Sequence, residues 1–182
     1  MVMALAKSVK PVVMVVRGPC VGISYTASAH ATFMYCSPEA KYITPFMKLN
    51  LKPEGTSTLM FPRIFGRRLA NEILLTDKMV KADLAAKSGF VNGIVDGFDK
   101  KSEWFNPDII PVIPKLLNTD YKTLVNCMAQ LNQSKDLAKI EEVTMRELKA
   151  LVETYANPQF LESLKMYLEA VSGTNSKKEA KM

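Results

Sequence analysis

The sequence predicts a mixed α/β domain over residues 1–96, followed by a helical region over residues 97–172 and a disordered tail over residues 173–182. Up to Asp96, short β-branched runs alternate with glycine turns and small apolar segments; beyond it, apolar side chains recur at helical spacing. The chain has 182 residues, of which 48% are hydrophobic and 23% charged, and this is the composition of one globular domain. A disordered, collagen-like or rod-like coiled-coil protein is excluded.

The first elements alternate between extended and helical patterns. A buried strand is predicted over Val12–Val16, and it ends at Arg17-Gly18-Pro19. The segment Cys20–Ser24 is a glycine-containing turn that leads into a predicted helix with small side chains over Tyr25–Tyr35. A short strand follows at Lys41–Thr44. This order is expected where the N-terminus of a helix lies close to another group.

The rest of the α/β part contains two predicted helices and one extended segment. Residues Lys48–Thr58 form the least regular stretch of this part. Helices are predicted over Arg67–Thr76 and Lys81–Ser88, the second ended by Gly89 as a C′ glycine. The segment Val91–Val95 is then extended.

Three helical stripes make up the C-terminal region. Apolar residues keep helical spacing over Tyr121–Leu131, over Leu137–Tyr155 and over Phe160–Val171. Asn157 is the predicted N-cap of the last helix, with a proline at its first position, and Gly173 is its predicted end. We interpret these stripes as packing faces.

Several functional classes are excluded by simple counts. The longest aliphatic run, Val12–Val16, has five residues against about twenty needed to cross a bilayer, so no membrane span is expected. Cys20, Cys36 and Cys127 are scattered and odd in number, which favours a reducing intracellular compartment. The single histidine, His30, cannot anchor a metal cluster.

The net charge of +6 favours an anionic partner, although part of it lies in the lysine-rich tail. A solvated lysine face is the simpler interpretation of most of the remainder. The basic residues are not interleaved with aromatic ones and no nucleic-acid-binding motif is present, so no nucleic acid is expected as a partner.

Two features could carry chemistry. Glu54, between a proline and a glycine, follows an apolar segment, and a carboxylate in apolar surroundings can act as a base on a carbon acid. The turn Gly18–Ile23 opens a helix and would present free backbone N–H groups to developing negative charge. On spacing alone, a turn glutamate in water and an ordinary strand-to-helix corner are the simpler interpretations.

Taken together, these stretches resemble the crotonase superfamily of enoyl-CoA hydratases and isomerases. Order and spacing agree across about residues 4–96, and the C-terminal helices resemble the trimerisation region of the family. The resemblance implies the C-terminal two-thirds of a ββα spiral fold. The matching runs are, in order, Lys10–Ser24, Thr44–Phe46, Pro53–Ser57, Phe61–Gly66 and Ala82–Asn92.

Within the superfamily, the chain is most similar to the Δ3,Δ2-enoyl-CoA isomerases of the peroxisomal and mitochondrial type. The two positions that hold catalytic glutamates in hydratases correspond to Thr26 and Phe46, and neither can move a proton from carbon. The isomerases of this branch carry their glutamate in a Pro-Glu-Gly-like turn, which matches Glu54.

The resemblance implies a single-base isomerisation of a 3-enoyl-CoA within fatty-acid β-oxidation. Glu54 is the implied catalytic residue, and the N–H of Ile23 is one implied oxyanion donor. An acyl-CoA thioester is the implied substrate, with no metal and no cofactor. The phosphates of CoA favour a basic rim, to which Lys52, Arg67 and Arg68 are candidate contributors, and a solvated surface is the alternative interpretation of these three residues. The other residues implied in the substrate pocket are Gly22, Phe46, Pro53 and Gly55.

The sequence also departs from the family. The N-terminal third of the family domain, which supplies the second oxyanion donor, has no counterpart, and Thr32 replaces an aspartate that is usual after the glycine-turn helix. A homotrimer, or completion by another chain, is therefore expected. Three hypotheses stay open: an isomerase, a non-catalytic subunit of a larger and possibly mitochondrial assembly, and, ranked last, a hydratase.

The resemblance places the protein in the peroxisome or in the mitochondrial matrix. The last three residues, Ala180-Lys181-Met182, resemble a loose variant of the Ser-Lys-Leu peroxisomal address. A match of three residues arises often by chance, so the two organelles stay as alternatives.

Overall fold

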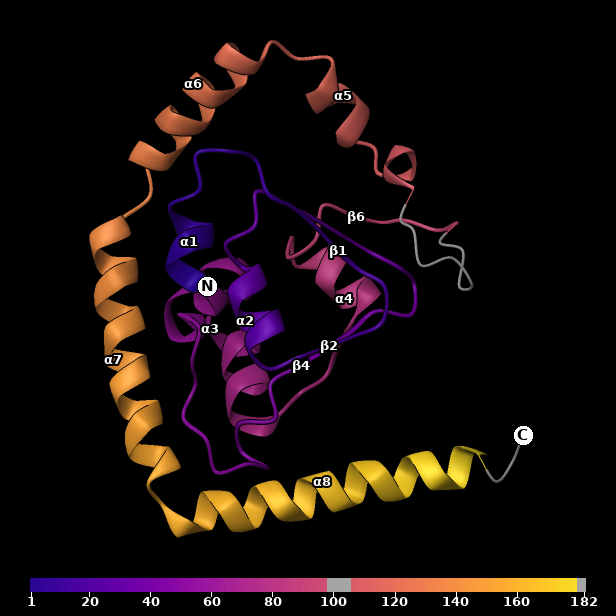
Figure 1. The fold of residues 1–182 in the computed structure, drawn as a ribbon, viewed down its shortest axis with the longest axis vertical. Helices are drawn as coiled ribbons and strands as arrows, with labels where there is room; N and C mark the ends of the chain where they lie inside the picture. The colour runs from indigo at the N-terminus through magenta and orange to yellow at the C-terminus, as the bar shows by residue number, and fades with distance from the viewer. Residues whose placement is uncertain (98–105, 180–182) are drawn as a thin grey trace.

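A computed structural model describes residues 1–97 and 106–179, with side chains described up to residue 170. In Figure 1, short strands lie at the centre with α1–α4 around them, and the later helices form an arc along the outside. Among the described residues, the strands lie between Val13 and Ile94, and the elements from Pro107 onward are helical.

Six strands form two sheets of three. In sheet A the order is β1 (Val13–Val16), β3 (Phe33–Cys36) and β6 (Gly93–Ile94), and all pairs are parallel. In sheet B the order is β2-β4-β5, with a parallel first pair and an antiparallel second pair. The strands of sheet B are β2 (Pro19–Val21), β4 (Lys41–Ile43) and β5 (Val80–Lys81).

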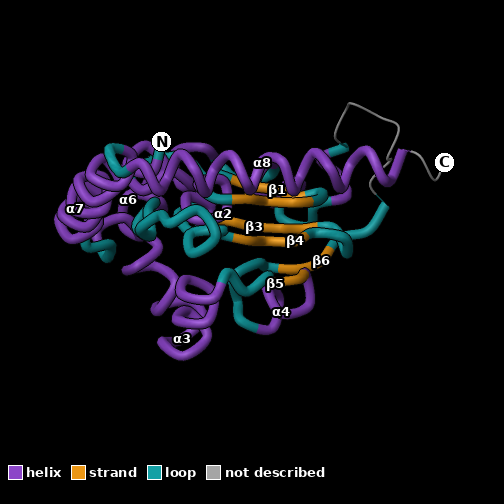
Figure 2. Tube along the Cα trace, turned by 90° about the horizontal axis from the view of Figure 1, so that it is seen from below, coloured by secondary structure: helices purple, strands orange, loops and turns teal. Residues whose placement is uncertain are grey.

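The first two turns of the chain each contribute one strand to each sheet before they enter a helix. β1 and β2 precede α2 (Ile23–Ser28), and β3 and β4 precede α3 (Ser57–Thr76). Figure 2 shows the strands stacked in layers, with α3 and α4 (Ala82–Lys87) on one side. This repeated strand–strand–helix order is the expected ββα spiral, and it brings the starts of α2 and α3 close together.

The core of the α/β part is built around aromatic rings. Tyr25 on α2 is fully buried, and its ring centroid lies 4.8 Å from that of Phe61 on α3 and 5.2 Å from that of Tyr42 on β4. Phe90 packs edge-on against Tyr25 at 5.1 Å. Because such pairs add to the free energy gained by burial, this cluster fixes α2 against α3 and sheet B.

The C-terminal helices cover one side of this core. In chain order they are η1 (Pro107–Ile109), α5 (Ile113–Leu117), α6 (Tyr121–Gln133), α7 (Leu137–Tyr155) and α8 (Pro158–Glu179). α7 contacts the short N-terminal helix α1 (Val2–Ala6) and also α3. The apolar stripes predicted for the C-terminal region lie on these helices.

The predicted helix over Tyr25–Tyr35 is wrong in its second half. α2 ends at Ser28, and Phe33–Cys36 forms β3, which pairs with all four residues of β1. The Thr32 hydroxyl accepts a hydrogen bond from the backbone N–H of Val12 at 3.0 Å. The pairing with β1 therefore determines the conformation of Phe33–Cys36, although the alanine-rich residues before this segment suited a helix.

The boundaries of two other helices also differ from the prediction. α3 begins at Ser57, ten residues before Arg67, and contains a break at Gly66, which has φ +73° and ψ +156°. α8 continues to Glu179, past the end predicted at Gly173. Residues 180–182, which complete the predicted tail, lie outside the described residues.

The predicted turn Gly18–Ile23 is wrong in part, because Pro19–Val21 within it forms β2, which pairs with β4. The remaining predicted helices and strands are confirmed with small shifts. The strands predicted over Val12–Val16 and Lys41–Thr44 correspond to β1 and β4, and Gly89, at φ +75°, follows α4. The Asn157 side chain accepts a hydrogen bond from the Gln159 N–H at 3.0 Å, so Asn157 caps α8 as predicted. Within the described part of the chain, none of the helices has the length and apolar character that crossing a membrane requires.

Candidate active site

The turn that carries Glu54 lies against the start of α2. Gly55 has φ +72°, and a Cβ at this position would collide with Oγ1 of Thr26 and lie 3.2 Å from Cδ1 of Ile23. Glycine is therefore required at position 55, both by its backbone conformation and by the close approach of α2. The Pro-Glu-Gly sequence thus holds Glu54 beside the first turn of α2.

Glu54 is half-buried and has one hydrogen-bond donor from α2. The Thr26 hydroxyl donates to Oε1 of Glu54 at 3.1 Å. Burial raises the pKa of Glu54, the nearby carboxylate of Glu147 raises it further, and the bond from Thr26 partly offsets both effects. A carboxylate in this environment has an increased affinity for a proton, as a base that removes a proton from carbon requires.

The start of α2 supplies a backbone donor. Gly22 is the N-cap with φ +61°, and its N–H donates to the Ile43 carbonyl of β4 at 2.9 Å, which anchors the turn to sheet B. Ile23 is the first residue of α2, so its N–H has no acceptor within the helix. Such an N–H is suited to stabilise a developing oxyanion.

Glu54 and Ile23 line the same cavity. Its volume is about 230 Å³, and its walls come from the Glu54 turn, the start of α2, the N-terminal segment and α7. Apolar side chains dominate the lining, which explains the burial that raises the pKa of Glu54. The lining residues are Met1, Val2, Met3, Ile23, Glu54, Gly55, Thr144, Leu148 and Leu151.

Three of the residues expected in the pocket, Gly22, Phe46 and Pro53, do not line this cavity. Phe46 is 2% exposed and lies in the hydrophobic core, and Pro53 is half-buried at the edge of the turn. Gly22 lies directly beside the lining residue Ile23. Of the site residues predicted from the sequence, Ile23, Glu54 and Gly55 therefore line this cavity.

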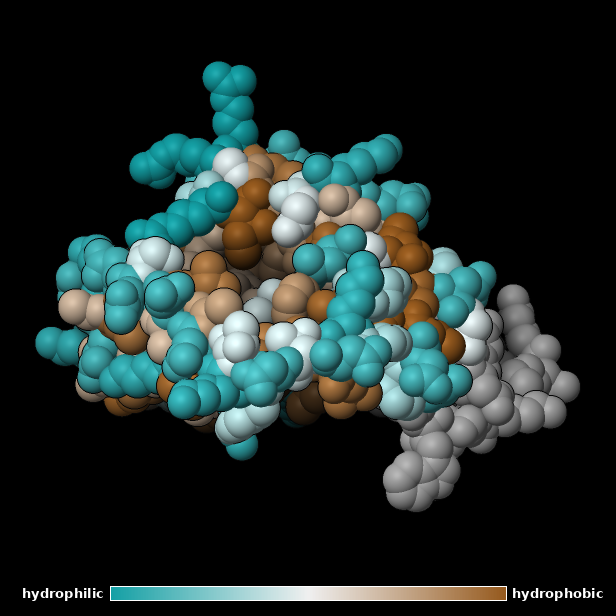
Figure 3. All heavy atoms as spheres, turned by 90° about the horizontal axis from the view of Figure 1, so that it is seen from above, coloured by the Kyte–Doolittle hydropathy of each residue, from teal (hydrophilic) through white to brown (hydrophobic). Residues whose placement is uncertain are grey.

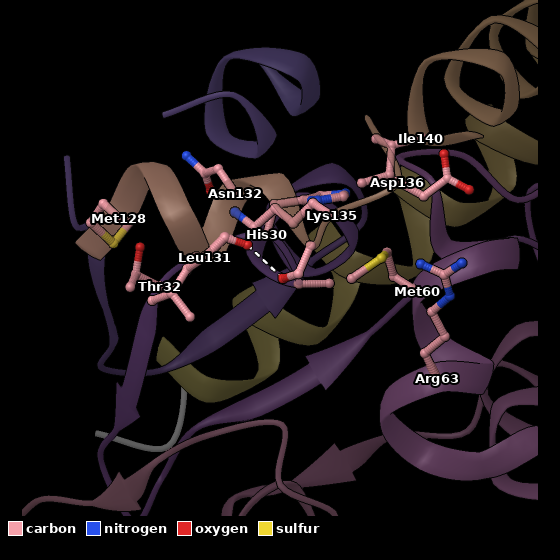
Figure 4. A pocket seen from close by; sticks show the side chains of 13 residues that line it. His30, Thr32, Met60, Arg63, Met128, Leu131, Asn132, Lys135, Asp136 and Ile140 are labelled. Atoms are coloured by element: carbon pink, nitrogen blue, oxygen red, sulfur yellow. Dashed lines mark hydrogen bonds between the residues drawn. The ribbon is translucent and has the colours of Figure 1, made fainter. Parts of the chain in front are cut away.

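A larger cavity of about 530 Å³ lies between the C-terminal end of α2 and the junction of α6 and α7. Figure 4 shows His30, Arg63, Asn132 and Lys135 around it, together with apolar side chains from α3, α6 and α7. Neither Glu54 nor Ile23 lines it. Figure 3 shows that the molecular face seen from above is also hollowed, with hydrophobic surface around the hollow.

Metal ligation is not favoured by the side chains that the structure describes. Among them, no group of three or more histidine, cysteine, aspartate or glutamate residues is placed to hold a metal ion. Burial raises the pKa of the Cys20 thiol to about 11, so this thiol stays protonated near neutral pH.

The family of the chain follows from a comparison of its sequence with models of protein families. The model of the family described as enoyl-CoA hydratase/isomerase matches residues 1–174. The chain belongs to the enoyl-CoA hydratase/isomerase family.

Relatives within this family include both named isomerases and proteins named for another domain. The chain is 31% identical over 162 residues to enoyl-CoA delta isomerase 3, peroxisomal, of Mus musculus, an alignment that covers 87% of this chain and 48% of the relative. It is 38% identical over 96 residues to enoyl-CoA delta isomerase 2 of Homo sapiens (52% and 24% covered). It is 25% identical over 169 residues to the human Chromodomain Y-like protein (88% and 26% covered).

Solved structures of enoyl-CoA hydratase/isomerase proteins share the fold. An enoyl-CoA hydratase from Mycobacterium avium subsp. paratuberculosis matches with a TM-score of 0.80 at 22% identity, covering 93% of this chain and 66% of that structure. An enoyl-CoA hydratase/isomerase from Pseudoalteromonas atlantica matches with a TM-score of 0.78, also at 22% identity (93% and 66% covered). The chain thus spans about two-thirds of these structures and a quarter to a half of the relatives above.

Thr26 and Phe46, the positions expected to correspond to hydratase carboxylates, have other contacts in this member of the enoyl-CoA hydratase/isomerase family. Thr26 donates to Glu54, and Phe46 packs in the core. Neither side chain is able to remove a proton from carbon or activate water, which leaves Glu54 as the acidic side chain in the cavity.

Sequence reasoning missed two buried residues beside the Glu54 turn. His30 is 6% exposed, and its Nε2 lies 2.5 Å from Oγ1 of Thr56. Glu147, on α7, is 5% exposed and accepts hydrogen bonds from Thr56 and Thr58. In the sequence, His30 stands out as the single histidine, in a segment of small apolar residues. Glu147 has the spacing of an ordinary charged residue on an amphipathic helix.

Proposed function

We propose that the protein is an enoyl-CoA isomerase that converts a 3-enoyl-CoA into the 2-trans isomer in fatty-acid β-oxidation. The observation that carries this proposal is the single cavity lined by the Glu54 carboxylate and by Ile23, the first residue of α2. The named delta-isomerase relatives support the same reaction.

The reaction moves one proton and needs no co-reactant. The ionised Glu54 carboxylate removes a proton from C2, and the electron pair of that C–H bond moves into the thioester to give an enolate. The C3–C4 double bond then becomes C2–C3 as C4 takes the proton back from Glu54. The raised pKa of Glu54 makes its carboxylate a stronger base for the first step. The carboxylic acid formed in that step is then the proton donor to C4 in the second.

The thioester oxygen becomes negative in the intermediate. The N–H of Ile23 is placed to donate to it, and the positive end of α2 adds to this stabilisation. Loss of one such donor typically raises the barrier by about 3 kcal/mol, so a second donor is required for efficient turnover. We assign it to a chain or segment that completes the fold, consistent with the share of the solved structures that this chain spans.

The substrate and assembly follow from the same proposal. An acyl-CoA has several phosphate charges, and the basic side chains of Lys52, Arg67 and Arg68 are exposed. Lys52 forms an ion pair with Glu153 at 3.0 Å. Lys52 would therefore have to leave Glu153 in order to bind a phosphate of CoA. A homotrimer, or a complex with a completing chain, is the proposed working form.

The replacement Glu54→Gln tests the reaction. It keeps the size of the side chain and removes the base, so kcat for 3-enoyl-CoA isomerisation should fall at least about 100-fold. The matched control is Glu72→Gln, because Glu72 is exposed on α3 and pairs with Lys78. The rate is followed by the absorbance of the conjugated 2-enoyl thioester. Equal rates for the wild type and Glu54→Gln would remove the proposal.

A second candidate function is a non-catalytic crotonase-fold subunit. Relatives named for a chromodomain, rather than for an enoyl-CoA reaction, are the observation that favours it. A wild-type chain that binds acyl-CoA or a partner without turnover would support this alternative. A hydratase is the remaining possibility, and water addition to a 2-enoyl-CoA is the assay that distinguishes it.

For the cellular location we propose the peroxisome, with the mitochondrial matrix as the alternative. The support is the relative named as peroxisomal. A fluorescent protein fused to the chain should mark the same organelles as a peroxisomal marker protein in the same cells. Signal that follows a mitochondrial marker instead would overturn the peroxisomal assignment.

A further inference from the structure

One buried charge lies beside the Glu54 turn without a role in the proposed chemistry. Glu147 comes from the middle of α7, 91 positions from Thr56, and its side chain is 5% exposed. Oε2 accepts from the backbone N–H of Thr56 at 2.6 Å. Oε1 accepts from the N–H of Thr58 at 3.1 Å and from its hydroxyl at 2.5 Å. Three donors from one short segment therefore converge on a single carboxylate.

These three donors form the beginning of α3. Thr56 is the N-cap of α3, but its side chain accepts no hydrogen bond from the N–H groups of the helix. Its hydroxyl donates instead to the Gly55 carbonyl at 2.6 Å. The first N–H groups of a helix require an acceptor from elsewhere when the cap does not supply one. Glu147 supplies this acceptor from a distant helix.

The segment held by Glu147 also has a strained backbone. Thr56 has φ +62°, a left-handed conformation that is uncommon for a β-branched residue and that persists only when its surroundings fix it. Gly55, with φ +72°, comes directly before it. Two successive left-handed residues thus make the sharp turn that brings the Glu54 side chain against Thr26.

We propose that Glu147 is a positioning residue for Glu54. By holding Thr56 and Thr58, its carboxylate fixes the Glu54–Gly55 turn against the start of α2, so that base and oxyanion donor keep their relative positions. This inference rests on the proposed isomerase function. The helical region was expected only to assemble the protein, and the inference gives one of its helices, α7, a role in the active site.

Two further observations support this role. The negative charge of Glu147 contributes to the raised pKa of Glu54, so the two carboxylates interact electrostatically as well as through the backbone. The neutral His30 ring also donates to Oγ1 of Thr56, since the single Thr56 hydroxyl proton is used on Gly55. Thr56 is therefore held both by Glu147 of α7 and by His30, which lies two residues after the end of α2.

The variants Glu147→Ala and Glu147→Gln test the role. Alanine removes the acceptor, and glutamine keeps a side-chain oxygen for some of the donors. A misplacement of about 1 Å at a catalytic base typically costs about 100-fold. We expect kcat to fall by about that factor in Glu147→Ala and by about tenfold in Glu147→Gln, with KM within about twofold of the wild type in both. The matched control Glu142→Gln, at an exposed position of α7, should keep the wild-type kcat.

Amide hydrogen exchange provides a readout that does not depend on turnover. The N–H groups of Thr56 and Thr58 should exchange faster in Glu147→Ala than in the wild type, while amides in the middle of α6 keep their rates. Should Glu147→Ala fail to fold, Glu147→Gln and Thr58→Val carry the test, because Thr58 is exposed and its replacement removes one donor to Glu147.

The outcomes separate the two proposals. If the wild type and Glu54→Gln are equally inactive, the proposed function fails and the role of Glu147 fails with it. If the wild type is active and Glu54→Gln is not, but kcat is unchanged in the Glu147 variants that fold, the positioning role alone is overturned. A loss that appears only in KM would also overturn it, because positioning of the base acts on the chemical step.

Discussion

The buried neutral ring of His30 makes the stability of the protein depend on pH. Burial lowers the pKa of His30 to about 4, with a further contribution from the charge of Lys135. The unfolded chain takes up this proton near pH 6.5, so it binds more protons than the folded chain between about pH 6.5 and 4. Stability linked to His30 is therefore complete above pH 6.5 and is lost as the pH falls towards 4, by about 3 kcal/mol in total.

Urea unfolding of the wild type and of His30→Gln, compared across this pH range, measures the effect. Glu54 and Glu147 act in the opposite direction, because their raised pKa values favour the folded state on acidification. For this reason the difference between the two proteins, rather than either curve alone, isolates His30. We expect the wild type to lose its advantage over His30→Gln as the pH falls. A difference that stays constant with pH would contradict a neutral, buried His30.

At the level of residues, the sequence is informative where the site is local. Glu54 and Gly55 are neighbours, and a glycine turn before a helix identifies Ile23, so these parts of the site follow from short motifs. Glu147 and His30 reach the same turn only after folding, because α7 and the end of α2 contact it through tertiary packing. Their spacing within their own segments gives no sign of this contact.

At the level of elements, the break in α3 depends on one glycine. Gly66 has φ +73° and ψ +156°, a backbone conformation that is essentially restricted to glycine. Nothing lies within 4 Å of a Cβ built at this position, so a substitution there acts through the backbone alone. We expect Gly66→Ala to destabilise the protein by about 1–3 kcal/mol.

Thermal or urea unfolding of Gly66→Ala checks this expectation. The matched control is Gly18→Ala, between β1 and β2, where a Cβ also meets nothing within 4 Å and φ is not in the left-handed range. Equal stability of Gly66→Ala and the wild type would mean that the two halves of α3 do not need the break. A continuous helix through Gly66 would then be the better description.

Helices and strands were predicted correctly where the local sequence pattern and the tertiary packing favour the same conformation. The stripes of α6 and α7 and the strand β1 follow directly from apolar periodicity. β3 was missed because it directly follows the alanine-rich segment of residues 27–31, which suited a helix, and its extended conformation is fixed by pairing with β1. The start of α3 was missed because it contains Pro62 and is capped by Glu147 from another helix.

At the level of the whole molecule, both sheets end in strands with an unpaired edge among the described residues. β1 is the first strand of sheet A and β2 the first of sheet B, and each pairs with a parallel neighbour on one side only. Large apolar side chains are also exposed on the outer helices, among them Val152 and Leu161. Exposed edges and apolar surface together favour association.

We therefore expect the protein to assemble in solution, as a homotrimer of the 20.3 kDa chain or with a completing chain. Native mass spectrometry of the purified protein should give three times the chain mass, or the mass of a defined complex. Leu161→Glu should shift the distribution towards monomer, because it places a charge on the apolar surface of α8. Gln159→Glu is the matched control, since it adds the same charge at an exposed polar position of α8. A well-folded wild-type monomer at high micromolar concentration would show that these edges and helices need no partner, and the second oxyanion donor would then have to come from this chain itself.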